Sequence, residues 1–367
     1  MPELLAEHTT FRIGGPAGRW VEATSEAELL GAVRAADAAG EELLILSGGS
    51  NVLVADAGFP GTVVHVATRG ITAEGSFCEF DADTDARSGA PEEGPLGGGA
   101  AACGGYLLTV QAGENWDDFV AYAVANELVG VEALSGIPGL VGSTPIQNVG
   151  AYGQEVAQTI WSVRTYDRVA QAVRTFANAD CGFAFRHSRF KAERGRYVVL
   201  QVTFQLEQGA LSAPVRYAEL ARRLGVAVGE RAPLAEVRRV VLELRRGKGM
   251  VSDPDDPDSW SAGSFFTNPI LDAEAAAGLP ADAPRFPQPD GRVKSSAAWL
   301  IEHAGFHRGF GTPPATLSTK HTLALTNRGG ASASDVVALA RRVRDGVQEA
   351  FGVLLAAEPV LVGVSLD

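Results

Sequence analysis

Apolar side chains recur with a helical period in four stretches of the chain. Leu29, Leu30 and Val33 form one such stripe, and Ser25 with Glu28 provides a capping box at its start. Ser332 introduces the longest stripe in the same way. The pattern therefore predicts four amphipathic helices, at about 26–39, 116–128, 234–246 and 333–351.

Other stretches are continuously apolar or alternate, which is typical of strands. Residues 43–46 form a short apolar run that leads into the glycine turn 47–51 and continues through 52–54. Residues 160–165 and 196–204 also have strand character, and 196–204 alternates apolar and polar positions. A last apolar strand, 354–362, contains one acid, Glu358.

Residues 136–153 contain five glycines and two prolines in eighteen positions, a composition that excludes a regular helix or a central strand. A long loop inside a compact domain is uncommon unless it binds something, and glycines let a ligand lie against backbone N–H groups. We call this segment the cradle and interpret it as a binding loop. A glycine-rich chain reversal is the alternative. The turn at 47–51 resembles a phosphate nest but is neither a G-x-G-x-x-G fingerprint nor a P-loop.

Two further segments interrupt the pattern. Residues 72–105 are rich in Gly, Ala, Pro and acids and are predicted to be a flexible insertion. Residues 251–261 are rich in Asp, Pro and Ser and are predicted to be a linker at a domain boundary.

A length of 367 residues indicates two or three domains, and a net charge of −13 argues against nucleic acid or an anionic membrane as the partner. Residues 186–248 nevertheless contain fourteen Lys or Arg and six Glu, which indicates solvated helix faces or an anionic ligand. Three scattered cysteines offer neither a disulfide framework nor zinc spacing. With no leader or membrane-spanning run, we expect a soluble, cytoplasmic chain without a bound metal.

Three residues have the character of catalytic groups. Glu358 lies in an apolar run, where a carboxyl group must be paired or have a shifted pKa. Ser264 precedes two phenylalanines that could shield its hydroxyl group, and Arg186 follows Phe185 on an apolar segment. A structural ion pair and a turn-forming serine are the alternatives for Glu358 and Ser264.

Seven motifs, in order and over nearly the whole chain, resemble those of the UDP-N-acetylenolpyruvoylglucosamine reductase family. They are 8–11 (HTTF), 48–53 (GGSNVL), 113–116 (GENW), the cradle, 185–188 (FRHS), 263–269 (GSFFTNP) and Glu358. Residues 215–220 (VRYAEL) resemble the Tyr-bearing loop of the longer type of this family.

The resemblance implies an α+β fold with a two-subdomain FAD-binding region of the vanillyl-alcohol-oxidase type and a smaller α+β substrate-binding domain. We expect residues 1–68 with 352–367 to form the first FAD-binding subdomain and 69–248 the second, with 72–105 as an insertion. Residues 249–351 would form the substrate-binding domain.

The resemblance also implies the reaction. NADPH would reduce a non-covalently held FAD and leave, and UDP-N-acetylglucosamine enolpyruvate would then be reduced to UDP-N-acetylmuramate for peptidoglycan synthesis. Arg186 and Glu358 match the positions that stabilise the developing charge, and Ser264 matches the proton donor. Tyr217, Lys248 and Asn268 match the contacts to the substrate diphosphate. No nucleic acid or membrane partner is implied, and we expect a monomer.

The cofactor-binding residues that the resemblance implies lie in the glycine turn and the cradle. They are Ser47, Gly48, Gly49, Ser50, Asn51, Val52, Gly136, Ile137, Pro138, Gly142, Ser143, Asn148, Gly150, Ala151 and Tyr152.

The chain departs from the family at Phe185, where a tyrosine is usual. A sugar or alcohol oxidase on the same scaffold often carries a histidine-linked flavin, and no histidine lies at 48–51. A non-catalytic sugar-nucleotide binding protein is the other alternative, but it would have no use for the serine, arginine and glutamate together.

Overall fold

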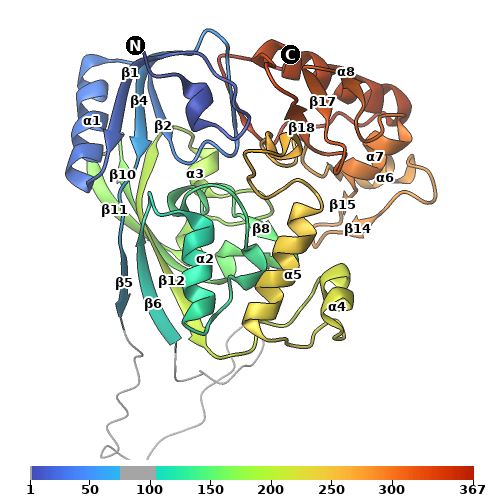
Figure 1. Cartoon of the computed structure of the whole chain (residues 1–367), viewed down its shortest axis with the longest axis horizontal. Coiled ribbons are helices and arrows are strands. Elements are labelled where there is room, and N and C mark those ends of the chain that lie inside the picture. The colour runs from blue at the N-terminus through green and yellow to red at the C-terminus, as the bar shows by residue number, and fades with distance from the viewer. Residues whose placement is uncertain (1, 75–104) are drawn as a thin grey trace, which may run out of the picture.

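The N-terminal part is a three-stranded parallel sheet covered by one helix. The computed structural model describes residues 2–74 and 105–367. The strands lie in the order β1-β4-β2, with β1 at Ala17–Ala23, β4 at Phe59–Val66 and β2 at Leu43–Leu46. Helix α1, Glu26–Ala39, begins at the predicted Ser25–Glu28 capping box, ends at Gly40 and packs beside β1 and β4 (Figure 1).

The chain returns to this part at its end. Strand β19, Val360–Val362, pairs in parallel with β3, Val52–Val54, and the Ala55 amide donates to the Val362 carbonyl at 2.8 Å. This pairing supports the grouping of 352–367 with 1–68, although the domain bounds remain a proposal. The predicted terminal strand is shorter than expected, because Glu358 precedes β19 rather than lying within it.

A six-stranded antiparallel sheet forms the centre of the molecule. Its order is β11-β10-β12-β6-β5, and β7 pairs with the end of β12. The predicted alternation is confirmed in β12, where Val198, Leu200, Val202 and Phe204 are buried. The strands are β5 Ile71–Glu74, β6 Gly105–Gln111, β7 Leu128–Val129, β10 Ile160–Asp167, β11 Ala172–Ala177 and β12 Tyr197–Gln208.

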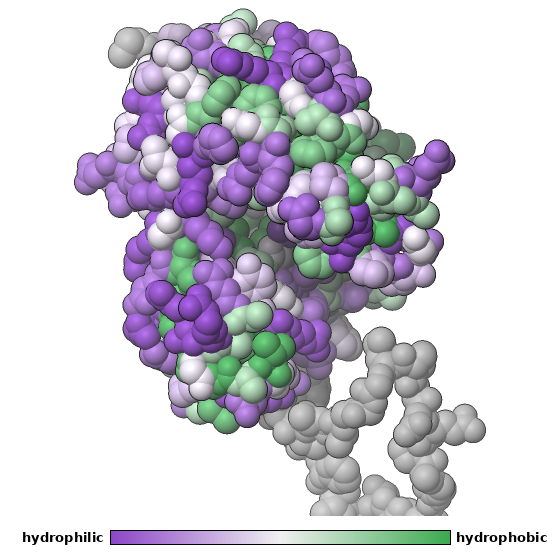
Figure 2. All heavy atoms as spheres, turned by 90° about the vertical axis from the view of Figure 1, so that its right-hand side faces the viewer, coloured by the Kyte–Doolittle hydropathy of each residue, from purple (hydrophilic) through white to green (hydrophobic). Residues whose placement is uncertain are grey.

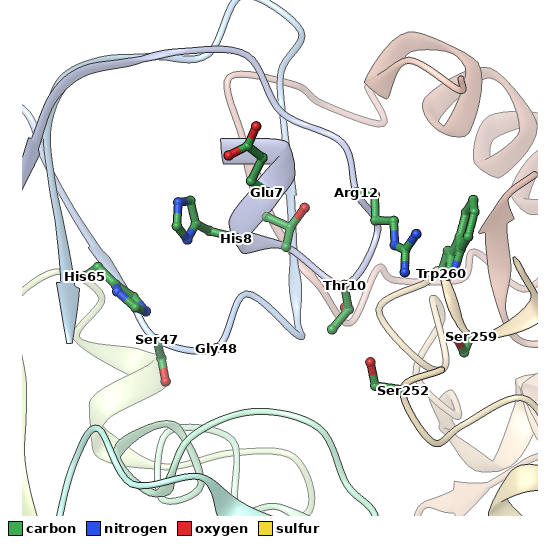
Figure 3. Close-up of a pocket in the computed structure, with 11 residues that line it drawn as sticks. Glu7, His8, Thr10, Arg12, Ser47, Gly48, His65, Ser252, Ser259 and Trp260 are labelled. Atoms are coloured by element: carbon green, nitrogen blue, oxygen red, sulfur yellow. The ribbon is translucent and has the colours of Figure 1, made fainter. Parts of the chain in front are cut away.

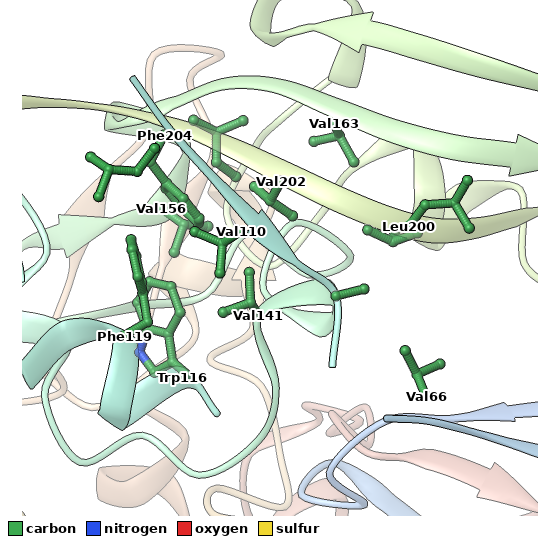
Figure 4. Packing of buried hydrophobic residues seen from close by; sticks show 14 of the residues in the cluster. Val66, Val110, Trp116, Phe119, Val141, Val156, Val163, Leu200, Val202 and Phe204 are labelled. Atoms are coloured by element: carbon green, nitrogen blue, oxygen red, sulfur yellow. The ribbon is translucent and has the colours of Figure 1, made fainter. Parts of the chain in front are cut away.

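The largest hydrophobic cluster lies between this sheet and α2, Trp116–Ala125. Trp116 and Phe119 of α2 face Phe204 of β12, with ring centroids 5.9 Å and 4.9 Å away (Figure 4). Val64 and Leu29 from the N-terminal part belong to the same cluster. The two parts of the predicted FAD-binding region therefore share one apolar core.

Residues 186–248, which carry the excess of basic side chains, contain three helices besides β12. These are the one-turn helix α3 Arg189–Ala192 and the longer helices α4 Ala218–Leu224 and α5 Leu234–Arg246. In α5, Arg238 forms an ion pair with Asp117 at 2.6 Å, and Arg239 pairs with Glu236 and Glu243. These two arginines therefore serve local ion pairs.

The C-terminal part has its own apolar core around α8, Ala333–Phe351, which begins at the predicted Ser332 capping box. Phe11 and Leu53 from the N-terminal part also enter this core. The other elements are α6 Ala273–Ala277, α7 Ala297–His303, β13 Ile270–Leu271, β14 Phe286–Pro287, β15 Val293–Lys294, β16 Gly311–Thr312, β17 Ala315–Leu317 and β18 Leu325–Asn327. The surface is hollowed between this part and the region of α4 and α5 below it (Figures 1 and 2).

The cradle contains more structure than a plain loop. It includes a 3-10 turn and strand β8, Gly150–Ala151, which forms a small hairpin with β9, Gln154–Glu155, directly after the cradle. The 3-10 turns of the chain are Leu5–His8, Glu132–Leu134, Val141–Ser143, Val156–Gln158, Asn178–Cys181 and Pro257–Ser259.

The predicted linker at 251–261 is packed against the C-terminal part in its second half. Asp258 is 4% exposed, forms an ion pair with Arg328 at 2.8 Å and accepts the Thr319 amide at 2.8 Å. The segment is packed because Arg328 neutralises the buried carboxylate.

Of the predicted insertion at 72–105, residues 75–104 lie outside the part that the structure describes. None of the helices in the described residues has the length and apolar character needed to cross a membrane.

Candidate active site

A cleft of about 500 Å³ lies where the glycine turn meets the cradle. The contact is close: a Cβ atom on Gly48 would stand 2.8 Å from the Gly139 Cα. The Asn51 side-chain amide also donates to the Gln147 side chain at 2.8 Å, and the Val360 amide donates to the Asn51 carbonyl at 2.9 Å. The turn, the cradle and the segment that carries Glu358 are therefore held together.

The structure places ten of the fifteen predicted cofactor residues along this cleft. They are Ser47, Gly48, Gly49, Ser50, Asn51, Val52, Ile137, Pro138, Ser143 and Gly150. The other five lie outside its lining, namely Gly136, Gly142, Asn148, Ala151 and Tyr152.

Two of these five have evident packing roles. A Cβ atom on Gly142 would lie 2.5 Å from the Ala112 Cβ. Asn148 is 1% exposed, and its amide donates to the Glu155 carboxylate and to the Ala184 carbonyl at 2.8 Å and 3.1 Å. Both residues therefore shape the loop from behind the cleft.

Arg186 and Glu358 meet in the wall of the cleft. The Arg186 Nε atom lies 3.2 Å from Glu358 Oε1, and the Arg186 Nη2 atom donates to the Gly150 carbonyl at 2.8 Å. Burial raises the pKa of Glu358, while Arg186 and then Lys191 act in the opposite direction. The Glu358 carboxyl group therefore keeps its proton to a higher pH than an ordinary glutamic acid.

Ser264 lines the same cleft and is held by its neighbour. The Phe265 amide donates to the Leu323 carbonyl at 2.7 Å, and the Phe265 carbonyl accepts the Glu358 amide at 2.9 Å. Phe265 and Phe266 are fully buried, and Gly263 has φ 71°. This backbone pairing fixes Ser264 and Glu358 on adjacent segments.

The three predicted diphosphate residues lie outside the lining of the cleft. Lys248 Nζ is 3.4 Å from a Glu219 carboxylate oxygen, and Tyr217 packs edge-on against Tyr152 with a centroid distance of 5.4 Å. Asn268 accepts the Ala297 amide at 2.9 Å, at the start of α7. Tyr217 and Lys248 thus share Tyr152 as a neighbour, since the Lys248 Nζ atom lies 6.0 Å from the centre of that ring, while Asn268 contacts a different helix.

Four cationic residues of the lining were missed by the sequence analysis: Arg168, Lys191, Arg194 and Arg245. Arg245 is 8% exposed, its Nη2 atom donates to the Met250 carbonyl at 2.7 Å, and its Nε atom has no partner among the described residues. Burial lowers its pKa to about 10. The available signal was its spacing, since Arg245 continues the apolar stripe of Val237 and Val241.

The lining suits a dinucleotide such as the expected FAD. The Ser47 hydroxyl group and the Arg245 Nε atom are buried in residues that line the cleft and have no partners among the described residues, so both are available to a polar ligand. Five cationic side chains and one carboxyl group line the cleft, which favours an anionic ligand. No group of His, Cys, Asp and Glu that could hold a metal ion occurs in residues 2–74 and 105–367.

A smaller pocket of about 280 Å³ lies on the other side of the glycine turn (Figure 3). Ser47 and Gly48 line both pockets, and the Arg12 guanidinium lies 3.9 Å from the centre of the Trp260 ring. The His65 Nδ1 atom in its wall has no partner among the described residues. The glycine turn is thus bordered by open space on two sides.

Two family models match parts of the chain. A family model described as "UDP-N-acetylenolpyruvoylglucosamine reductase, C-terminal domain" matches residues 255–362, and one described as "FAD binding domain" matches residues 101–175.

Two relatives named UDP-N-acetylenolpyruvoylglucosamine reductase are similar over almost the full chain. The relative from Cutibacterium acnes is 55% identical over 99% of this chain and 90% of its own, and the relative from Streptomyces coelicolor is 54% identical with the same coverage. The crystal structure of a UDP-N-acetylenolpyruvylglucosamine reductase from Thermus caldophilus has a similar fold, with a TM-score of 0.62 at 24% identity, over 99% of this chain and 98% of that one.

Proposed function

The chain belongs to the UDP-N-acetylenolpyruvoylglucosamine reductase family, and from that premise we propose how its own residues carry out the reaction. It is an FAD-containing, NADPH-dependent oxidoreductase that converts UDP-N-acetylglucosamine enolpyruvate to UDP-N-acetylmuramate, a precursor of peptidoglycan. The observation that carries the residue assignment is the convergence of Arg186, Ser264 and Glu358 on one cleft bounded by the glycine turn.

The glycine turn and the cradle would hold the FAD. Backbone N–H groups of Gly48 and Gly49 and the unpartnered Ser47 hydroxyl group suit its diphosphate. When bound there, FAD would supply the hydride transfer from NADPH to the double bond of the enolpyruvyl group. The apolar residues of the cleft, such as Ile137 and Trp116, exclude water around it.

Arg186 and Glu358 stabilise the charge that appears in the substrate. Hydride addition at the terminal carbon leaves negative charge on the neighbouring carbon and on its carboxylate, as in an enolate. The guanidinium offers a fixed positive charge, and a neutral Glu358 carboxyl group donates a hydrogen bond to the growing anion. Because burial favours the protonated form of Glu358, the residue is suited to this donor role.

Ser264 completes the reaction by giving a proton to the same carbon. An alkoxide is a costly product in water, but the acceptor here is a strongly basic carbanion, and the site is shielded by Phe265 and Phe266. The backbone bond between Phe265 and Glu358 keeps the proton donor and the charge-stabilising pair in fixed relation.

The diphosphate of the sugar nucleotide would be bound by Tyr217, Lys248 and Asn268. Tyr217 is 41% exposed at the start of α4, and Lys248 follows α5, so both lie where a nucleotide could reach them from solvent. Arg245, one helical turn before Lys248, extends this cationic path into the cleft.

We also infer that the enzyme acts as a monomer in the cytoplasm, without nucleic acid or membrane partners. NADPH and UDP-sugars are available there, and the net charge of −13 disfavours polyanionic partners. Cys181, the cysteine that the described residues include, is free and buried, as expected in a reducing compartment.

The Ser264→Ala variant tests the assignment through its two half-reactions. Reduction of the bound flavin by NADPH should stay within about threefold of wild type, because that step needs no proton from Ser264. Reoxidation by the enolpyruvyl substrate should slow by at least about 10³-fold, the scale of a positioned acid or charge stabiliser. Stopped-flow absorbance of the flavin measures both rates. Equal slowing of the two half-reactions would show that Ser264 only supports the fold.

A further inference from the structure

Arg186 is held in a backbone conformation that an arginine rarely adopts. The Ala184 and His187 amides and carbonyls pair at 3.1 Å and close a tight turn, in which Arg186 has φ 52°. Glycine and asparagine are favoured at this position of a turn, since a Cβ atom crowds the backbone there. A strained residue persists only where its surroundings hold it, and such residues cluster at functional sites.

Lys191 contacts the backbone of this strained residue. Its ammonium group donates to the Arg186 carbonyl at 2.9 Å, and the side chain reaches this position from α3, one turn after the strained residue. The Ser188 hydroxyl group accepts the Lys191 amide at 3.3 Å and donates to the Ile146 carbonyl at 2.5 Å, which anchors α3 to the cradle. The carbonyl contact therefore links the turn of Arg186 to a fixed point on the cradle.

The Lys191 ammonium also stands among the charges of the site. It lines the cleft together with Arg186 and Glu358. The charged groups that act on it are Glu358, Arg194 and Arg186, and the groups that act on Glu358 are Arg186 and Lys191. The Lys294 ammonium group, which lies 4.5 Å from the centre of the Phe185 ring, is a further cation near the turn.

We propose that Lys191 is a positioning residue for the reduction of the enolpyruvyl group: it fixes the Arg186 backbone so that the guanidinium meets Glu358, and its ammonium group adds a second cation to the cleft wall that this pair occupies. This inference rests on the proposed function and adds a residue to it. Lys191 contacts a carbonyl group rather than the reacting atoms, so it acts through the pair.

The test compares Lys191→Met with Lys191→Arg in the flavin-loaded enzyme. Lys191→Met should slow reoxidation by the enolpyruvyl substrate about 10–100-fold, as expected when a catalytic group is displaced by up to about 1 Å. Reduction by NADPH should change much less. The reoxidation rate should fall at alkaline pH as Glu358 loses its proton, and we call this fall the alkaline limb. The loss of a nearby positive charge should move the alkaline limb to higher pH by at least about 0.5 unit, because the Glu358 proton is then held more tightly. Lys191→Arg should restore the wild-type limb.

Arg189→Met is the matched control. Arg189 lies in the same one-turn helix and carries the same charge, but its guanidinium lies over the Phe176 ring at 5.1 Å, and it does not line the cleft. Arg189→Met should leave the rates of both half-reactions within about twofold of wild type and the alkaline limb at its wild-type pH, because the Arg189 side chain makes no contact with Arg186 or Glu358. A similar shift of the alkaline limb in Lys191→Met and Arg189→Met would mean that only net charge matters, and it would overturn the specific role of Lys191.

The contrary outcomes are distinct. If Lys191→Met slows both half-reactions equally and leaves the limb in place, Lys191 is merely structural and the proposal is wrong. If Lys191→Met does not retain flavin, Lys191→Gln, which keeps a donor without the charge, takes its place, and a wild-type limb in that variant overturns the proposal. Failure of the wild type and of Arg189→Met to be reoxidised by the substrate would instead refute the proposed function.

Discussion

At the scale of single residues, Glu358 is subject to two opposing influences on its pKa. Its side chain is 13% exposed, and burial disfavours the charged form, while Arg186 at 3.2 Å favours it. Burial has the larger effect, so the pKa is raised. The protonated fraction, which can donate a hydrogen bond to the substrate anion, therefore falls only as the pH rises through this raised pKa.

Glu358→Gln should remove that pH dependence. A carboxamide keeps a donor but cannot ionise, so reoxidation by the enolpyruvyl substrate should be about 10–100-fold slower and should lack the alkaline limb seen in wild type. The measurement is the reoxidation rate from pH 6 to pH 10 in stopped flow. An alkaline limb that persists unchanged in Glu358→Gln would assign the limb to another group.

Lys248 and Tyr217 should differ in their effect on the sugar nucleotide. A charge-assisted hydrogen bond contributes about 1.5–3 kcal/mol and a neutral one about 1 kcal/mol, so Lys248→Ala should weaken substrate binding about tenfold more than Tyr217→Phe. Loss of Lys248 also leaves Glu219, 3.4 Å away, to repel the diphosphate. NADPH binding should weaken in parallel, since it also carries a diphosphate. Titration of both ligands on both variants measures this, and an unchanged sugar-nucleotide affinity in Lys248→Ala would contradict the assignment.

The cleft residues that the sequence predicted differ in kind from those that it did not predict. Ser264 and Arg186 stand in short motifs in which the neighbouring phenylalanines indicate a shielded or apolar position, so both could be predicted as site residues from the sequence. Arg245 stands beside Arg246 at the end of a basic helix, and a pair of arginines at a helix end is usually solvated. Its spacing after Val237 and Val241 is the sequence signal that separates Arg245 from Arg246, and the packing of α5 places Arg245 in the lining of the cleft.

At the scale of elements, local signals were sufficient for three of the four predicted helices, whereas α2 ends at Ala125 and Leu128 of the predicted helix lies in β7. The capping boxes of α1 and α8 are encoded within four residues, and the structure confirms both. The pairing of β19 with β3 joins residues about 300 positions apart, so no local pattern could reveal it. The burial of Asp258 likewise depends on Arg328, seventy residues further along the chain.

The glycine turn provides a test of how an element holds the cofactor. In Gly48→Ala the new Cβ atom would lie 2.8 Å from the Gly139 Cα, so the turn must move away from the cradle. We expect FAD affinity to fall at least about tenfold, because a dinucleotide site depends on close backbone approach.

Gly31→Ala is the control for this substitution. Gly31 lies in α1, and a Cβ atom there would meet nothing within 4 Å. Alanine in a helix is about 0.5–1 kcal/mol more favourable than glycine, so this variant should be slightly more stable and should bind FAD normally. Fluorescence titration of the flavin-free protein gives both affinities, and normal FAD binding by Gly48→Ala would contradict the role of the turn.

At the scale of the whole molecule, an acidic chain carries a cationic cleft. The net charge is −13, yet the cleft is lined by Arg168, Arg186, Lys191, Arg194 and Arg245. The parallel sheet, the antiparallel sheet and the C-terminal part each contribute a wall, because the glycine turn, the cradle and the Ser264 segment come from different parts of the chain. A cleft formed at the junction of three parts suits two large anionic ligands that bind one after the other.

We infer that this cleft passes hydride from NADPH to an enolpyruvyl sugar nucleotide. The visible absorbance of the flavin in the purified protein, kept free of oxygen and followed through two additions, tests this inference. One equivalent of NADPH should bleach the flavin, and UDP-N-acetylglucosamine enolpyruvate should then restore the colour, with one equivalent of UDP-N-acetylmuramate formed. Colour that returns only when oxygen is admitted would overturn this assignment and identify the protein as a flavin oxidase.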